Sequence, residues 1–216
     1  MGPQASLELH RRIIRRVSAN GARDGTDFPY IVHLSLPVPD FIANEARRND
    51  TLEIIINELK NISASMDDVI IIACNTAHLL QPDIEQRLNI RITSMVDATI
   101  DYVSRHHKTI RLLASPTTIR TGLYDKPLKT VEVTVLTPDD NERQALETII
   151  RALIAGRTVP QLALEKVERI AKFDRVEINN YVENHLNNPP ILLGCTELSC
   201  AFAKKAKHHR PNEYSD

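Results

Sequence analysis

The stretch DDVIIIACNTAH, from Asp67 to His78, places a thiol, an amide and a hydroxyl directly after a buried apolar run. The chain repeats this arrangement at PPILLGCTELS, from Pro189 to Ser199. Each time, a run of Val, Ile and Leu ends in a small residue, a cysteine and a threonine one or two places further on. Such runs are typical of fully buried parallel strands, and the repetition raises the question of what two matching cysteines do.

The composition indicates a globular protein and argues against nucleic-acid-binding and membrane-binding classes. The chain has 216 residues, 42% of them hydrophobic, with 27 basic against 28 acidic side chains. This size allows one large or two small domains with a real core. The balanced charge argues against nucleic acid or an anionic membrane as partner, so we expect a small molecule or another protein.

The cysteines and the apolar runs predict a cytoplasmic protein. Cys74, Cys195 and Cys200 are odd in number and form no CxxC pair, which suits a reducing compartment better than a disulfide framework. No apolar run approaches the ~20 residues of a membrane span, and residues 1–16 contain no signal-peptide core.

Short β-rich runs alternate with longer helical patterns, which predicts an α/β fold with a mainly parallel sheet. The expected strands are 30–34, 69–73, 91–95, 109–114, 131–136 and 191–194. The expected helices are 4–19, 51–63, 76–88, 139–156 and 160–186, and a further helix follows Pro116.

An internal duplication is the most informative feature of the chain. The segment LLASPTTIRTGLYDK at 112–126 resembles the opening MGPQASLELHRRI without its strand, with Pro3 in the place of Pro116. Applying the spacing of the first half after Cys195 predicts a strand where the chain reads RPNEYSD and ends. We therefore expect two related halves, the first lacking its first strand and the second its last. The alternative is chance similarity between α/β units.

Two cysteines at the carboxyl ends of parallel strands lie where open α/β sheets bind ligands. If the halves pack about a pseudo-twofold axis, Cys74 and Cys195 face one another. A helix N-terminus lowers the pKa of a thiol, so one cysteine can act as a base and the other as an acid, which inverts a tetrahedral carbon. Substrate carboxylates are then expected on backbone N–H groups and on four side chains: Asn75, Thr76, Thr118 and Thr196.

Other interpretations of these residues stay open at this point. A buried cysteine is often only a small hydrophobic side chain. A phosphatase-like nucleophile would need a nearby arginine, which neither Cys74 nor Cys195 has. Cys74 and His78 could form one edge of a metal site, but no second pair completes four ligands. We expect no metal, with His78 hydrogen-bonded to the protein and Cys200 packed on the last helix.

The segments ACNTAH, GCTELS, MGPQAS and SPTTIRTGLY resemble the aspartate/glutamate racemase family from Met1 to about Ala203. The resemblance implies two pseudo-symmetric α/β domains, here 1–97 and 98–205 followed by a polar tail at 206–216, with the active site between them. It also implies cofactor-independent two-base racemization of an amino acid, without pyridoxal phosphate, and a homodimer.

By position, the resemblance makes Cys74 and Cys195 the two acid/base thiols. It assigns the substrate α-carboxylate and amino group to the four polar side chains named above. It also places the loop from Met1 to Gln4, which includes Gly2, beside the substrate.

The chain departs from the family in two respects. Relatives usually begin with a strand and a glycine pair and continue past the second cysteine segment to another strand. Aspartate-specific relatives also tend to have an arginine where this chain has Phe41, and a lysine where it has Ile154. Loss of these cations argues against a simple aspartate racemase, although Arg47, Arg48 or Arg157 could replace them.

Two further functions remain as alternatives. One is a non-catalytic small-molecule-binding relative, and the other is an isomerase or decarboxylase that acts on another carbanion-forming acid.

Overall fold

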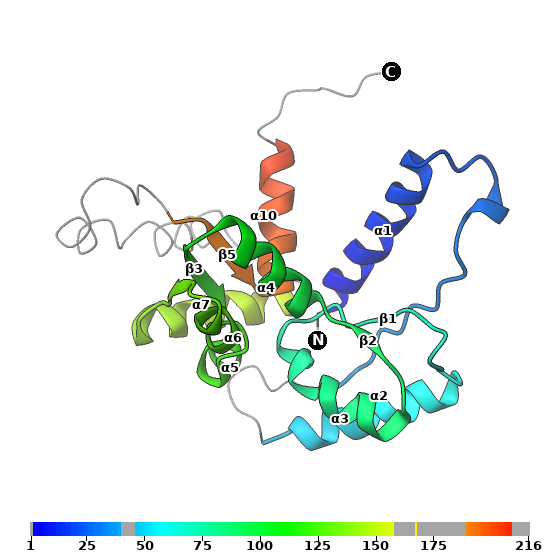
Figure 1. The fold of residues 1–216 in the computed structure, drawn as a ribbon, viewed down its shortest axis with the longest axis horizontal. Coiled ribbons are helices and arrows are strands. Elements are labelled where there is room, and N and C mark those ends of the chain that lie inside the picture. Colours follow the sequence, from blue (N-terminus) through cyan, green and yellow to red (C-terminus); the bar gives the residue numbers. More distant parts are fainter. Residues whose placement is uncertain (1, 40–45, 158–166, 168–188, 209–216) are drawn as a thin grey trace.

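The computed structural model describes residues 2–39, 46–157, 167 and 189–208. Within these residues the strands form two parallel sheets (Figure 1). In the first sheet, β1 (Ile70–Ile71) pairs with β2 (Ile92–Thr93). The second sheet has the order β4-β3-β5, with β3 (Thr109–Ala114) between β4 (Thr134–Leu136) and β5 (Ile191–Gly194). The predicted parallel α/β architecture is confirmed.

The first half packs two helices on its small sheet. Helix α2 (Arg48–Asn61) and helix α3 (Gln81–Leu88) share one apolar cluster with β2. A short 3-10 helix, η2 (Thr76–Leu80), leads into α3, and Asn89 ends α3 in the left-handed conformation with φ 50°. The core residues of this cluster are Leu52, Ile55, Ile56, Leu59, Leu80, Ile84, Ile90 and Ile92.

Helices cover both faces of the second sheet. Since alternate residues of β3 point to opposite faces, they pack against different helices. Ile110, Leu112 and Ala114 pack with α4 (Met95–His106) and α6 (Asp125–Thr130). Leu113 packs instead with α7 (Asp140–Ile154) and with Cys195. A capping box between Asp139 and Glu142 fixes the start of α7. The short α5 (Pro116–Thr121) follows β3 directly.

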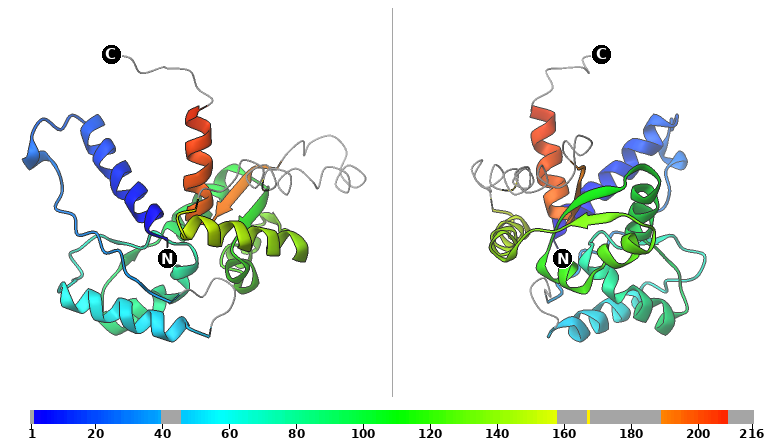
Figure 2. Two further views of the ribbon diagram at one scale, coloured as in Figure 1. Left: turned by 180° about the vertical axis from the view of Figure 1, so that it is seen from behind. Right: turned by 60° about the vertical axis from the view of Figure 1, so that its left-hand side comes forward.

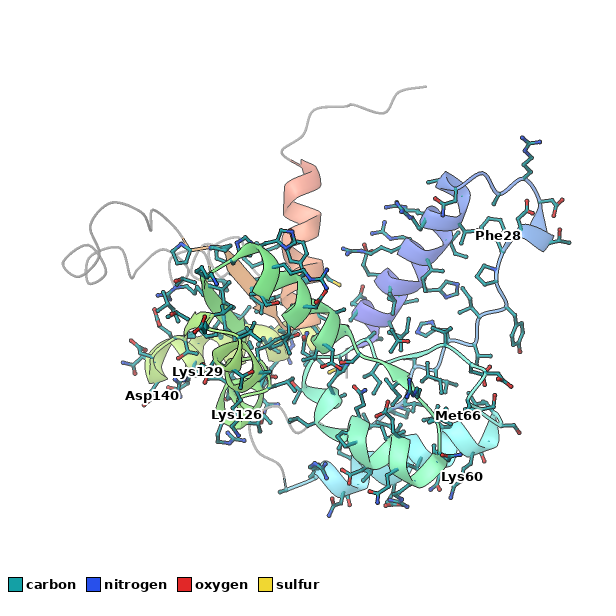
Figure 3. The ribbon with its side chains drawn as sticks, viewed as in Figure 1. Phe28, Lys60, Met66, Lys126, Lys129 and Asp140 are labelled. Atoms are coloured by element: carbon teal, nitrogen blue, oxygen red, sulfur yellow. The ribbon has the colours of Figure 1, made fainter. Side chains whose placement is uncertain are left out.

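Helices α1 (Pro3–Ala19) and α10 (Thr196–His208) contact one another and diverge from a common starting region between the halves (Figure 2). Both begin at candidate site residues: α10 follows Cys195 directly, and α1 follows Gly2 directly. A short 3-10 helix, η1 (Gly25–Asp27), follows α1. Side chains from both halves fill the region between them, whereas Lys126, Lys129 and Asp140 lie on the outer side of the second half (Figure 3).

The structure corrects several sequence predictions. Strand 30–34 is absent: Leu34, Leu36 and Val38 do pack on the first cluster, but segment 28–39 has no strand partner among the described residues. The predicted strand 131–136 begins only at Thr134, because α6 extends to Thr130 and Glu132 turns the chain with φ 59°. Helix α4 was not predicted.

The remaining predicted elements agree to different degrees. Strands 109–114 and 191–194 match β3 and β5. The predicted helix 76–88 divides into η2 and α3. Apart from residue 167, the predicted helix 160–186 lies outside the described residues. In the part of the chain that the structure describes, no helix is both long and apolar enough to span a membrane.

Candidate active site

The first cysteine follows β1 at the point where the chain turns into η2. Cys74 is a free, half-buried thiol. The turn is braced by His78, whose Nδ1 donates to the backbone oxygen of Cys74 at 2.8 Å. Because burial lowers the pKa of His78, the imidazole is neutral and Nδ1 carries its proton. The expectation that His78 is hydrogen-bonded to the protein is confirmed.

The second cysteine follows β5 and directly precedes α10. Cys195 is a free thiol with 6% of its surface exposed, and it packs in a cluster with Leu113 and Leu198. Its Sγ donates a hydrogen bond to Oε2 of Glu197 at 3.3 Å. The same carboxylate oxygen lies 3.1 Å from Thr196 Oγ1, whose single proton it shares with the backbone oxygen of Ala73.

The two cysteine segments touch one another. Thr196, which follows Cys195, donates its hydroxyl to the backbone oxygen of Ala73, which precedes Cys74, at 3.3 Å. The carboxylate of Glu197 acts on both thiols, because its negative charge raises the pKa of Cys74 and of Cys195. Residues 121 apart in sequence therefore share one electrostatic environment.

Both thiols are protonated at neutral pH in the substrate-free protein. Burial is the main cause that raises each pKa, and the charge of Glu197 is the second. Backbone N–H groups at the helix starts lower both values, as the sequence suggests, but they oppose larger effects. The expectation of a thiol with a lowered pKa is therefore wrong for this state.

Glu197 is the functional candidate that sequence reasoning missed. Its carboxylate is buried, with 5% of the residue exposed, and among the described residues Oε1 has no hydrogen-bond partner. Gly2 lies directly against it, since a Cβ built on Gly2 would come within 2.2 Å of Oε1. The available signal was the acidic residue two places after Cys195 in GCTELS. Met1 lies outside the described residues.

Two of the expected substrate-binding hydroxyls are engaged with one another. Thr76 Oγ1 lies 2.9 Å from Ser115 Oγ and 3.0 Å from Thr118 Oγ1, and Ser115 Oγ lies 3.0 Å from Thr118 Oγ1. All three side chains are buried. This hydroxyl triangle, made of Thr76, Ser115 and Thr118, joins the first half to the second.

Asn75 is also held from the second half. Tyr124, at the start of α6, donates its hydroxyl to Oδ1 of Asn75. Both residues are buried, Tyr124 with 1% and Asn75 with 3% exposed. Burial raises the pKa of Tyr124, with smaller contributions from the charges of Cys74 and Cys195.

The three arginines that could replace the missing cations are exposed or held by other residues. Arg48 binds Asp83 and donates to the backbone oxygen of Leu79, which ties α2 to α3. Arg47 is exposed beside Asp50, and Arg157 is exposed after α7. Phe41 lies outside the described residues.

Ile154, near the end of α7, packs against the cluster that contains Cys195. Ile154 therefore makes an apolar contact here and supplies no cation.

Comparison with known proteins gives consistent matches. The family model described as Asp/Glu/Hydantoin racemase matches residues 1–211. The chain is similar to the broad specificity amino-acid racemase RacX of Bacillus subtilis, with 26% identity over 154 residues that cover 71% of this chain and 67% of RacX.

Two solved structures show the same fold. An aspartate racemase homologue from Pyrococcus horikoshii is 26% identical, with a TM-score of 0.64 over 92% of this chain and 83% of that one. Picrophilus torridus aspartate racemase is 22% identical, with a TM-score of 0.68 over 96% of this chain and 82% of the other. The two-domain α/β fold expected from the sequence is thereby confirmed.

Proposed function

The chain belongs to the Asp/Glu/Hydantoin racemase family, and from this premise we propose that it is an amino-acid racemase that inverts the α-carbon between Cys74 and Cys195. The observation that carries the proposal is the meeting of the two cysteine segments, where Thr196 donates to Ala73 and one carboxylate acts on both thiols. Two-base inversion needs an acid and a base on opposite faces of one carbon. Two thiols from related halves of the chain supply that pair.

Glu197 is the acceptor for the proton that Cys195 must lose. Its Oε2 already accepts the Cys195 thiol hydrogen bond, so the proton can pass along that bond to the carboxylate as the thiolate forms. The Cys195 sulfur then takes the α-proton of the substrate, and the Cys74 thiol gives its proton to the opposite face and is left as a thiolate. In the reverse direction the Cys74 thiolate is the base and the Cys195 thiol is the acid. When the product leaves instead, Cys74 regains a proton from solvent and Glu197 releases the one that it accepted, which restores the resting state.

Substrate binding relies on polar groups near the thiols. We assign the Asn75 amide nitrogen as a donor to the α-carboxylate, since the N–H groups of Glu197 and Leu198 at the start of α10 already bond to Cys195. Thr196 lies at the joint of the two cysteine segments, and Gly2 lies beside Glu197. We assign Thr76 and Thr118 to the joint between the halves, where their hydroxyls already have partners.

We further propose that the preferred substrates lack a side-chain carboxylate. Ile154 packs on the cluster around Cys195 in place of a cation, and Arg48 is held by Asp83. A second negative charge on the substrate would meet the buried carboxylate of Glu197 without a compensating cation among these residues. Neutral amino acids avoid this cost.

The test is α-proton exchange in deuterated water, followed by NMR for a panel of neutral, basic and acidic amino acids. We expect exchange with neutral amino acids that exceeds exchange with aspartate. Cys74→Ser and Cys195→Ser should each lose most of it, whereas Cys200→Ser serves as the matched control and should retain it. Absence of exchange with every amino acid, in protein shown to be folded, would contradict the proposal.

A further inference from the structure

Tyr124 is a buried aromatic residue between the two cysteine segments. It lies two residues after Gly122, which ends α5 in the left-handed conformation with φ 72°, and its ring packs in the cluster that contains Leu112 and Leu128. Only 1% of the residue is exposed. The ring is therefore fixed by its surroundings before any ligand binds.

The ring and the hydroxyl of Tyr124 reach different cysteine segments. The hydroxyl donates to Oδ1 of Asn75, the residue after Cys74. The ring edge lies against Gly194, the residue before Cys195, since a Cβ there would be 3.3 Å from Tyr124 Cε2. Tyr124 thus contacts the neighbour of each cysteine.

We propose that Tyr124 is a positioning residue for the racemization proposed above: by donating to Asn75 Oδ1, it turns the Asn75 amide nitrogen toward the substrate carboxylate. The inference rests on the proposed function for its catalytic consequence. It concerns a residue that touches no reacting atom and acts through Asn75.

The physical basis is the asymmetry of the amide group. An asparagine side chain has an acceptor at one end and two donors at the other, so the partner of one end decides what the other end presents. A flipped Asn75 would set its oxygen against the substrate carboxylate, where two acceptors repel. Because burial raises the pKa of Tyr124, its hydroxyl keeps its proton and remains a donor throughout the pH range of catalysis.

The first test needs no substrate. Relaxation of the side-chain amide ¹⁵N of Asn75, assigned with Asn75→Asp, reports how firmly the amide is held. We expect an order parameter of about 0.85 in the unmodified protein, as for rigid backbone, and below about 0.6 in Tyr124→Phe. Tyr102→Phe is the matched control because Tyr102 is exposed on α4, and it should leave the order parameter unchanged. A mobile amide in the unmodified protein, or an equally ordered one in Tyr124→Phe, overturns the inference.

The second test is a double-mutant cycle on α-proton exchange. Tyr124→Phe should lower kcat/KM about tenfold, mainly through KM, because it weakens a contact made in both ground and transition states. In an Asn75→Ala background, Tyr124→Phe should lower kcat/KM less than about twofold, because the side chain through which Tyr124 acts is absent. An equal loss in both backgrounds would show that Tyr124 acts only on general structure and overturns the inference. Inactive unmodified protein would instead refute the racemization, and the amide measurement would still decide the positioning role.

Discussion

Replacement of Ser115 by alanine should destabilise the protein more than an ordinary loss of a helix cap. Ser115 caps α5 by accepting from Thr118 N at 3.3 Å, and it is also one corner of the hydroxyl triangle with Thr76 and Thr118. Ser94 caps α4 in the same way, accepting from Asp97 N at 3.0 Å, and is not part of the triangle. Ser94→Ala is therefore the matched control.

The expected magnitude follows from the bonds that are lost. Loss of a serine cap costs about 1 kcal/mol, which is the whole effect expected for Ser94→Ala. Ser115→Ala also removes one partner from each of two buried hydroxyls, although Thr76 and Thr118 keep their bond to one another. A poorly satisfied buried polar group adds about 1–2 kcal/mol, for a total of about 2–3 kcal/mol.

Thermal and urea unfolding measure this difference. For a chain of this length, 1 kcal/mol shifts Tm by about 2–4 °C, so we expect about 2–4 °C for Ser94→Ala and about 4–12 °C for Ser115→Ala. Equal losses of unfolding free energy in the two variants would refute the reasoning, because the triangle would then contribute nothing to the joint between the halves.

Three further predictions concern the site. Glu197→Gln should speed alkylation of both thiols by iodoacetamide near pH 8, because the charge that raises their pKa is removed. The same variant should lower kcat for α-proton exchange about 10²-fold, because the proton acceptor is lost. A rise or a fall of both rates together would contradict this prediction. Gly2→Ala should lower kcat/KM, because its Cβ would displace the Glu197 carboxylate, whereas Gly25→Ala, with open space around its Cβ, should not; enzyme kinetics on both variants decide this. Burial raises the pKa of Cys195 above its unfolded value of about 8.5, so the free energy of unfolding should be constant below that pH and decrease as the pH rises through it. Cys195→Ser should make this decrease smaller, as measured by urea unfolding at a series of pH values. An equal decrease in the variant and the unmodified protein would contradict this prediction.

The sequence predicts the elements that depend on local pattern. Segments 109–114 and 191–194 are strands to the residue: they pair with one another in parallel, and β3 is buried from Ile110 to Ala114. Segment 30–34 has a similar composition but no strand, since a strand also needs a hydrogen-bonded neighbour and none pairs with it among the described residues.

The sequence also locates both cysteines at strand ends, but it does not reveal their partners. Thr76 and Thr118 were predicted to bind substrate from their residue type, and their engagement with Ser115 depends on how the halves dock. The direction of the thiol pKa was wrong for the same reason, because burial and the charge of Glu197 are products of packing. Contacts between residues distant in sequence leave no periodic signal.

The most direct measurement of the central claim is the early distribution of deuterium during racemization of a neutral amino acid in deuterated water. Two opposed thiols predict that the product enantiomer gains deuterium at the α-carbon while the remaining substrate stays unlabelled, starting from either enantiomer. Equal labelling of substrate and product from the first turnovers would contradict a pair of bases on opposite faces, and with it the roles assigned to Cys74 and Cys195.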